Sequence, residues 1–162
     1  MPDDEVLIRR RRLPHWTLPG STYFLTFRLR VPPLFAAERM LVRDHVVAGH
    51  GRYYDLAAVV VMPDHAHALL TPAAGVTLPR VMQGIKGASA RRLNEARRTA
   101  GPVWQTESFD RIVRDGDEFA QKLSYMVANP VTAGLVEEGM GYDGWWCRPD
   151  LGQPPADRPG GQ

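Results

Sequence analysis

The stretch Leu56-Ala-Ala-Val-Val-Val-Met-Pro-Asp-His-Ala-His-Ala-Leu-Leu-Thr71 decides the fold of this chain. Its two halves are mainly apolar runs of strand length, and Pro63-Asp64 separates them. Proline presets φ for the first central position of a tight turn, and aspartate can bond its own backbone at the second. Residues 56–62 and 65–71 are therefore predicted to form an antiparallel hairpin with His65 at its bend.

Further elements are predicted on both sides of this hairpin from side-chain periodicity and capping signals. In chain order they are a strand over 22–30, a helix over 35–49, the hairpin, a helix over 77–101, a strand over 103–113 and a helix over 117–128. Thr77 can cap the second helix and Gly101 can stop it, while Pro130 is expected to follow the end of the third.

The order βαββαβ predicts an α+β fold, namely a ferredoxin-like antiparallel sheet with helices on one face and an added C-terminal helix that carries Tyr125. Residues 1–147 are predicted to form a single domain with a basic N-terminal arm. Residues 148–162 are too poor in apolar side chains to pack and are predicted to be a disordered tail. Because many functions use this fold, function has to be argued from the side chains of a site.

Composition excludes several classes of protein. With 162 residues and 44% hydrophobic side chains, the chain suits one globular domain. No apolar run approaches the roughly 20 residues that span a bilayer, and there is no signal-peptide core, so a cytoplasmic protein without a membrane partner is expected. The lone Cys147 excludes an internal disulfide and a cysteine-based zinc site.

Positive charge is concentrated in two places, although the net charge is only +2. One is the run from Arg9 to Arg12, and the other is the predicted second helix, which carries six cations against a single Glu95. Either patch could contact nucleic acid or be an ordinary solvated surface. Gly84 and Gly87 lie inside this helix at a cost of about 1 kcal/mol each, so close packing against the sheet, or a bound phosphate backbone, is expected at that face.

His65-Ala66-His67 places two imidazoles two residues apart on a predicted strand, where alternation sends both to one face. Two nitrogen ligands on one face can chelate a metal ion. Such a pair alone also fits ordinary packing or surface histidines, so a third ligand is needed.

The predicted third helix supplies a possible ligand and a possible nucleophile. Projected at about 100° per residue, its apolar side chains form one stripe. These are Phe119, Ala120, Leu123, Met126 and Val127. Tyr125 points nearly the opposite way, beside Gln121 and Asn129, and this favours a functional hydroxyl over a half-exposed structural tyrosine. Asn129 could instead simply end the helix before Pro130.

These pieces suggest one chemistry. A divalent ion held by His65, His67 and the amide oxygen of Asn129 would keep positions open for phosphate oxygens and draw charge from the phosphorus. A free phenol has a pKa of about 10, so a tyrosine hydroxyl needs such a cation to become a nucleophile at neutral pH, and Tyr125 would be that nucleophile. Its product would be a protein–DNA phosphotyrosine, which conserves the bond energy for rejoining.

The same segments resemble the REP-associated tyrosine transposases, which are single-tyrosine HUH transposases. The matching segments are residues 10–16, 23–28, 61–67, 104–105, 125–130 and 133–136. This resemblance implies a catalytic domain over residues 1–147. It also implies a metal-dependent endonuclease and strand transferase for single-stranded or hairpin DNA. Such an enzyme acts on REP-type palindromic repeats through a covalent 5′-phosphotyrosine and uses Mg²⁺ or Mn²⁺. In that family pattern His65 and His67 are the metal ligands, Tyr125 is the nucleophile and Asn129 completes the metal site.

A larger group of residues is expected to contact the DNA. It consists of Arg9, Arg10, Arg11, Arg12, Lys86, Arg91, Trp104 and Gln105. Lys86 fits a solvated lysine as well, and Trp104 fits the core as well as base stacking. Two other functions stay open at this point: a domesticated hairpin-binding protein without nuclease activity, and a phosphohydrolase that uses water as its nucleophile. The sequence does not decide between a monomer and a dimer. It also does not show whether the tyrosine acts within its own subunit.

Overall fold

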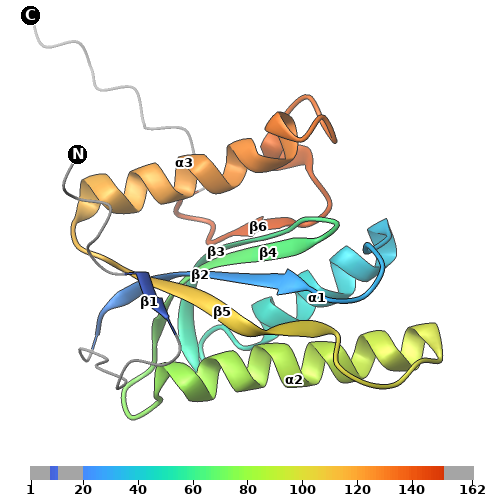
Figure 1. The fold of residues 1–162 in the computed structure, drawn as a ribbon. Helices are drawn as coiled ribbons and strands as arrows, with labels where there is room; N and C mark the ends of the chain where they lie inside the picture. Colours follow the sequence, from blue (N-terminus) through green and yellow to red (C-terminus); the bar gives the residue numbers. More distant parts are fainter. Residues whose placement is uncertain (1–7, 11–19, 152–162) are drawn as a thin grey trace, which may run out of the picture.

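A six-stranded antiparallel sheet lies between two layers of helices in the computed structural model, which describes residues 8–10 and 20–151 (Figure 1). The strands are β1 Ile8–Arg10, β2 Thr22–Leu29, β3 Tyr54–Val61, β4 His65–Pro72, β5 Trp104–Val113 and β6 Trp145–Cys147. The helices are α1 Ala36–Ala48, α2 Leu78–Arg97 and α3 Gly116–Thr132, with a short 3-10 turn, η2, at Gly139–Gly141.

The strand order is β1-β5-β2-β4-β3-β6, and its four central strands have the ferredoxin-like arrangement predicted from the sequence. The fold class is therefore confirmed. The two outer strands, β1 and β6, were not predicted, because a strand of three residues is too short to display an alternating pattern.

Each face of the sheet has its own apolar core. Leu25 and Phe27 of β2 point toward α1 and α2, whereas Phe24 points toward Met126 of α3. Figure 1 shows α1 and α2 together on one side and α3 alone on the other. Alternation along the central strands thus buries both faces, and it directs the face that carries His67 toward α3.

The predicted hairpin turn is confirmed, and its backbone also accepts hydrogen bonds from the end of β2 and from the loop that follows it. The amide of Met62 donates to the carbonyl of His65 at 2.8 Å, which closes the bend. The amide of Leu29 donates to the carbonyl of Asp64, and that of Leu34 donates to the carbonyl of Pro63, both at 2.8 Å. These bonds fix the loop between β2 and α1 against the start of β4.

The expectation that Gly84 and Gly87 allow close packing on the sheet is wrong. Both glycines lie on the exposed side of α2, and a Cβ atom built on either would have no heavy atom within 4 Å. The buried side of α2 is made by larger side chains such as Val81 and Ile85. None of the helices in the described ranges is long and apolar enough to cross a membrane.

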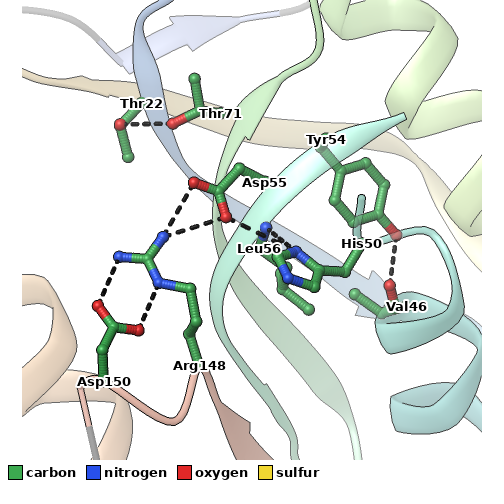
Figure 2. A network of polar contacts seen from close by, with 9 residues as sticks. All are labelled: Thr22, Val46, His50, Tyr54, Asp55, Leu56, Thr71, Arg148 and Asp150. Atoms are coloured by element: carbon green, nitrogen blue, oxygen red, sulfur yellow. Dashed lines mark hydrogen bonds and ion pairs between the residues drawn. The ribbon is translucent and has the colours of Figure 1, made fainter. Parts of the chain in front are cut away.

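The predicted tail begins too early in the sequence. The amide of Arg148 donates to the carbonyl of Ala57 at 2.8 Å, and its guanidinium bonds both Asp55 and Asp150 (Figure 2). Leu151 packs against the core beneath α3. Ion pairing and one apolar side chain therefore attach residues 148–151 to β3, and residues 152–162 lie outside the described part of the chain.

Candidate active site

His65 and His67 lie on the same face of β4, beneath α3, with their ring centroids 4.8 Å apart. His67 is buried, whereas His65 is partly exposed at the start of the strand. The ring of Phe24, from the neighbouring strand β2, stacks on His67 at 5.0 Å. The pair is thus held by the sheet and by an aromatic neighbour.

Each imidazole has a partner for its Nδ1 atom. Nδ1 of His65 lies 2.7 Å from a carboxylate oxygen of Asp64, and Nδ1 of His67 lies 2.8 Å from the hydroxyl of Thr26. The carboxylate of Asp64 can only accept, so it favours the tautomer of His65 that has its proton on Nδ1. In this arrangement the Nε2 atom of His65 carries a lone pair and no proton.

His67 is held as a neutral ring. Burial, followed by the nearby His65, lowers the pKa of His67 from 6.5 to about 3. Its Nε2 atom is buried and has no hydrogen-bond partner within the described residues. A neutral imidazole with a buried, unused nitrogen is suited to hold a metal ion, because an unsatisfied polar atom otherwise costs free energy.

Helix α3 brings the two further predicted residues to this pair. The ring of Tyr125 lies 5.5 Å from that of His67, centroid to centroid, and 53% of Tyr125 is exposed. The amide nitrogen of Asn129 lies 3.4 Å from Nε2 of His65. Half a turn about χ2 would place the amide oxygen of Asn129 there instead. The oxygen and nitrogen of an amide have nearly the same shape, so either can occupy this position.

Asn129 does not end the helix, because α3 continues through Pro130 to Thr132. Proline lacks the N–H group of an ordinary helical residue, but the carbonyl of Pro130 accepts from the amide of Leu135 at 2.9 Å and the proline is buried. The other end of α3 is tied to the sheet by Glu118, which bonds Arg111 of β5 at 2.7 Å. These contacts set the position of Tyr125 over the histidines.

The set of donors fits a divalent ion with open positions. Within the described residues, no group of three or more His, Cys, Asp and Glu side chains could hold a metal, so a third protein donor beside the two histidines would be the amide of Asn129. Two imidazoles and one amide oxygen would leave several sites of an octahedral ion for water or phosphate. Sequence reasoning had identified this set correctly as neighbours in space.

Two cations near the histidines were not predicted. Arg28 is opposite His65 in the register of β2 and β4. The hydrogen bond with His65 lowers the pKa of Asp64 and burial lowers that of His67, and the charge of Arg28 adds to both effects. Lys122 also acts on His67, and its ammonium lies 4.9 Å from the ring centroid of Phe24. Lys122 comes three residues before Tyr125 on a helix, which is a spacing that could have identified it.

Some of the residues predicted to contact DNA have other contacts in the structure. Trp104 is a correction: its ring is buried against Phe27, and its indole nitrogen donates to the hydroxyl of Ser89 at 2.8 Å, so it belongs to the core. Lys86 bonds the carbonyl of Gln105 at 2.7 Å and other oxygens of β5.

The remaining predicted contacts stay predictions. Arg91 and Gln105 are exposed. Arg9 and Arg10 lie on β1, of which the backbone is described, and Arg11 and Arg12 lie outside the described residues.

One family model matches part of the chain. Residues 49–112 match the family model of the IS200-like transposases, and this segment contains the hairpin with both histidines. The segment ends before α3, so Tyr125 and Asn129 lie beyond it. The transposase resemblance seen in the sequence is thereby confirmed.

Comparison with solved structures agrees. The chain is similar to a REP-associated tyrosine transposase bound to a REP hairpin, with a TM-score of 0.66 and 20% identity over 79% of this chain and 77% of that one. It is less similar to a transposase from Deinococcus radiodurans R1 described as putative, with a TM-score of 0.47 and 23% identity over 70% of this chain and 94% of the other. No curated protein sequence matches the chain. The first of these likenesses shows that the chain shares its fold with that REP-associated tyrosine transposase.

Proposed function

We propose that the chain is a metal-dependent endonuclease and strand transferase for single-stranded or hairpin DNA, with Tyr125 as its nucleophile. The observation that carries this proposal is the meeting of two distant segments, because α3 places Tyr125 beside His67 and Asn129 beside His65. The buried Nε2 atom of His67, which has no partner within the described residues, supports a bound ion beside Tyr125.

The metal is Mg²⁺ or Mn²⁺ in this proposal. His65, His67 and the amide oxygen of Asn129 would hold the ion. When bound, such an ion neutralises charge on a phosphate and lowers the cost of forming a phenolate. Asp64 and Thr26 orient the two imidazoles, and burial keeps His67 neutral and ready to donate its lone pair.

The proposed reaction is a transesterification. The hydroxyl oxygen of Tyr125 loses its proton and forms a bond to phosphorus, while the bond between phosphorus and the 3′ oxygen breaks. The 3′ oxygen takes up a proton and leaves as a free hydroxyl, and the 5′ end of the DNA stays on the protein as a phosphotyrosine. A DNA hydroxyl can later attack this ester and join the strands without ATP, since no bond energy is lost to water.

The proposed substrate is a REP-type palindromic hairpin with unpaired flanks. Its support is the structural neighbour, which is a transposase bound to a REP hairpin, together with the cations Arg28 and Lys122 near the histidines. Because Tyr125 and His67 of one chain are neighbours, we further propose that the tyrosine acts within its own subunit.

A tyrosine-to-phenylalanine pair of variants tests this function. Tyr125→Phe should bind a labelled hairpin oligonucleotide with nearly wild-type affinity and form no covalent adduct in Mn²⁺, as judged by denaturing electrophoresis. Tyr53→Phe is the matched control, because Tyr53 is 44% exposed but lies outside the site. It should form adduct at the wild-type rate.

The alternatives give different results in the same assay. If water were the nucleophile, Tyr125→Phe would still cut the DNA and leave a free 5′-phosphate. If the chain only bound hairpins, the wild-type protein would bind tightly but cut none of the hairpins that flank its gene. Either result would overturn the proposed reaction.

A further inference from the structure

An apolar groove with a volume of about 660 Å³ lies beside α2, at the end of the sheet that carries His65. Its walls include Val31, Pro33, Leu93 and Val103, and Phe35 stands on its rim. Phe35 is 76% exposed, which is the largest value among the exposed large hydrophobic side chains of the described residues. An aromatic ring in this position is available to a partner.

The three polar side chains that line the groove, Asn94, Arg97 and Thr99, all have hydrogen-bond partners, so the groove offers a mainly apolar surface. The guanidinium of Arg97 bonds the carboxylate of Glu38 at 2.9 Å and the carbonyls of Pro32 and Pro33 at 3.0 Å. The amide group of Asn94 donates to the carbonyl of Gly101 at 2.9 Å. These bonds hold the walls in place, so a ligand would meet a preformed site.

The groove lies on the α2 side of the sheet, and backbone hydrogen bonds connect its wall to the turn that precedes His65. Leu34, next to Phe35, bonds the carbonyl of Pro63, and Pro63 is two residues before His65. The amide of Arg30 bonds the carbonyl of Val103, which belongs to the groove wall. A short path along the end of β2 therefore leads from the histidines to the groove.

Exposed cations lie along this path. Arg28 is opposite His65 in the β2–β4 register, and Arg30 follows it two residues later toward the groove. Both side chains are exposed. Cations spaced along a strand, followed by an exposed aromatic ring at an apolar groove, are the features by which proteins hold single-stranded nucleic acid.

We propose that the groove receives an unpaired base of the DNA strand that flanks the scissile phosphate. The base stacks on Phe35, and the phosphates that lead to it run beside Arg28 and Arg30. This inference rests on the proposed function, because it takes the strand to pass over His65 and Tyr125. It adds a subsite that selects unpaired DNA, since a paired base could not leave its stack to reach Phe35 without an energetic cost.

The test uses a hairpin oligonucleotide with single-stranded flanks that carries 2-aminopurine at one flank position at a time. In the full chain with Tyr125→Phe, which leaves the DNA uncut, one or two adjacent positions should show fluorescence quenching on binding. Adding Phe35→Ala should remove this quenching and weaken binding about 5- to 100-fold, which is the usual range for one base–aromatic stack. Phe35→Trp should retain both.

The control variant is Tyr53→Ala, which removes an exposed aromatic ring away from the groove and should change neither signal. An abasic site at the quenched position should weaken DNA binding by the protein that retains Phe35. It should not change the DNA affinity of the Phe35→Ala variant. Absence of quenching that depends on Phe35 would overturn the subsite. An equal effect of Phe35→Ala on intact and abasic DNA would also overturn it, since Phe35 would then contact another segment of this chain or another partner.

This binding result is separate from the proposed function. Quenching and affinity are measured without cleavage, whereas the covalent adduct on Tyr125 is measured without 2-aminopurine. Failure of the subsite with intact adduct formation would leave the reaction standing, and the reverse result would leave a DNA-binding site without the reaction.

Discussion

The Nδ1 atoms of the two histidines have hydrogen-bond partners from different parts of the chain. Asp64 is the residue before His65 in the chain, so its contact is local, whereas Thr26 reaches His67 from another strand. The contact of Thr26 is buried. In a buried site a single hydroxyl can decide which ring nitrogen carries the proton, and therefore which one can bind a metal.

Thr26→Val should weaken Mn²⁺ binding by about 10- to 100-fold, because the isosteric side chain keeps the packing but no longer orients His67. Electron paramagnetic resonance titration of free Mn²⁺ measures this affinity directly. Thr22→Val is the matched control, because Thr22 lies on the same strand and bonds Thr71 at 2.7 Å instead of a histidine. An unchanged affinity in Thr26→Val would contradict the role of Thr26.

At the scale of elements, α2 carries two glycines on an exposed face. Gly84→Ala and Gly87→Ala should each raise the free energy of unfolding by up to about 1 kcal/mol, because alanine has the higher helix propensity and nothing lies within 4 Å of the new Cβ atom. Urea unfolding of each variant checks this.

Gly20→Ala provides the contrast. Nothing lies within 4 Å of its Cβ position either, but Gly20 has a φ of +79°, so alanine there should destabilise the chain. If Gly84→Ala and Gly87→Ala destabilised the protein as Gly20→Ala is expected to, the exposed face of α2 would have another role in the folded chain.

Helix α3 shows what local sequence could and could not predict. Its periodicity predicted that Met126 is buried, and that Tyr125 and Asn129 share a separate stripe. The pairing of strands determines that Phe24 and Thr26 surround His67, and this pairing depends on contacts between residues far apart in the chain. The periodicity of a single segment does not show how that strand is aligned with its neighbours, so these contacts could not be predicted.

Both faces of the sheet have an apolar core, and only the face beneath α3 also carries the two histidines. Helices α1 and α2 cover one face, and α3 with the proposed site covers the other (Figure 1). The order of strands and the hairpin turn followed from local patterns. Trp104 was placed wrongly, because an aromatic ring has the same appearance in a sequence whether it packs in a core or stacks on a base.

Stability of the whole fold should fall in acid through Glu38, which joins α1 to α2. A hydrogen bond from Arg97 lowers the pKa of Glu38 below 4.5, against the opposing effect of burial. The contribution of its carboxylate is therefore present above pH 4.5 and is lost as the pH falls through the folded-state pKa. Urea unfolding at neutral pH and at steps below 4.5 should show this loss in the wild-type protein.

Glu38→Gln should be less stable than the wild-type protein at neutral pH, and the difference should shrink in acid, because both chains then carry a neutral group there. A constant difference across the whole pH range would contradict the role of the Glu38 charge.

The most direct test of the central claim is to locate the bond between protein and DNA. The wild-type chain is incubated with a cognate hairpin oligonucleotide and Mn²⁺, digested with nuclease and protease, and its peptides are analysed by mass spectrometry. We predict that the peptide containing Tyr125 carries a nucleotide phosphate on the tyrosine oxygen. Cleaved DNA with a free 5′-phosphate and no modified peptide, or a modification at a different tyrosine, would contradict the account.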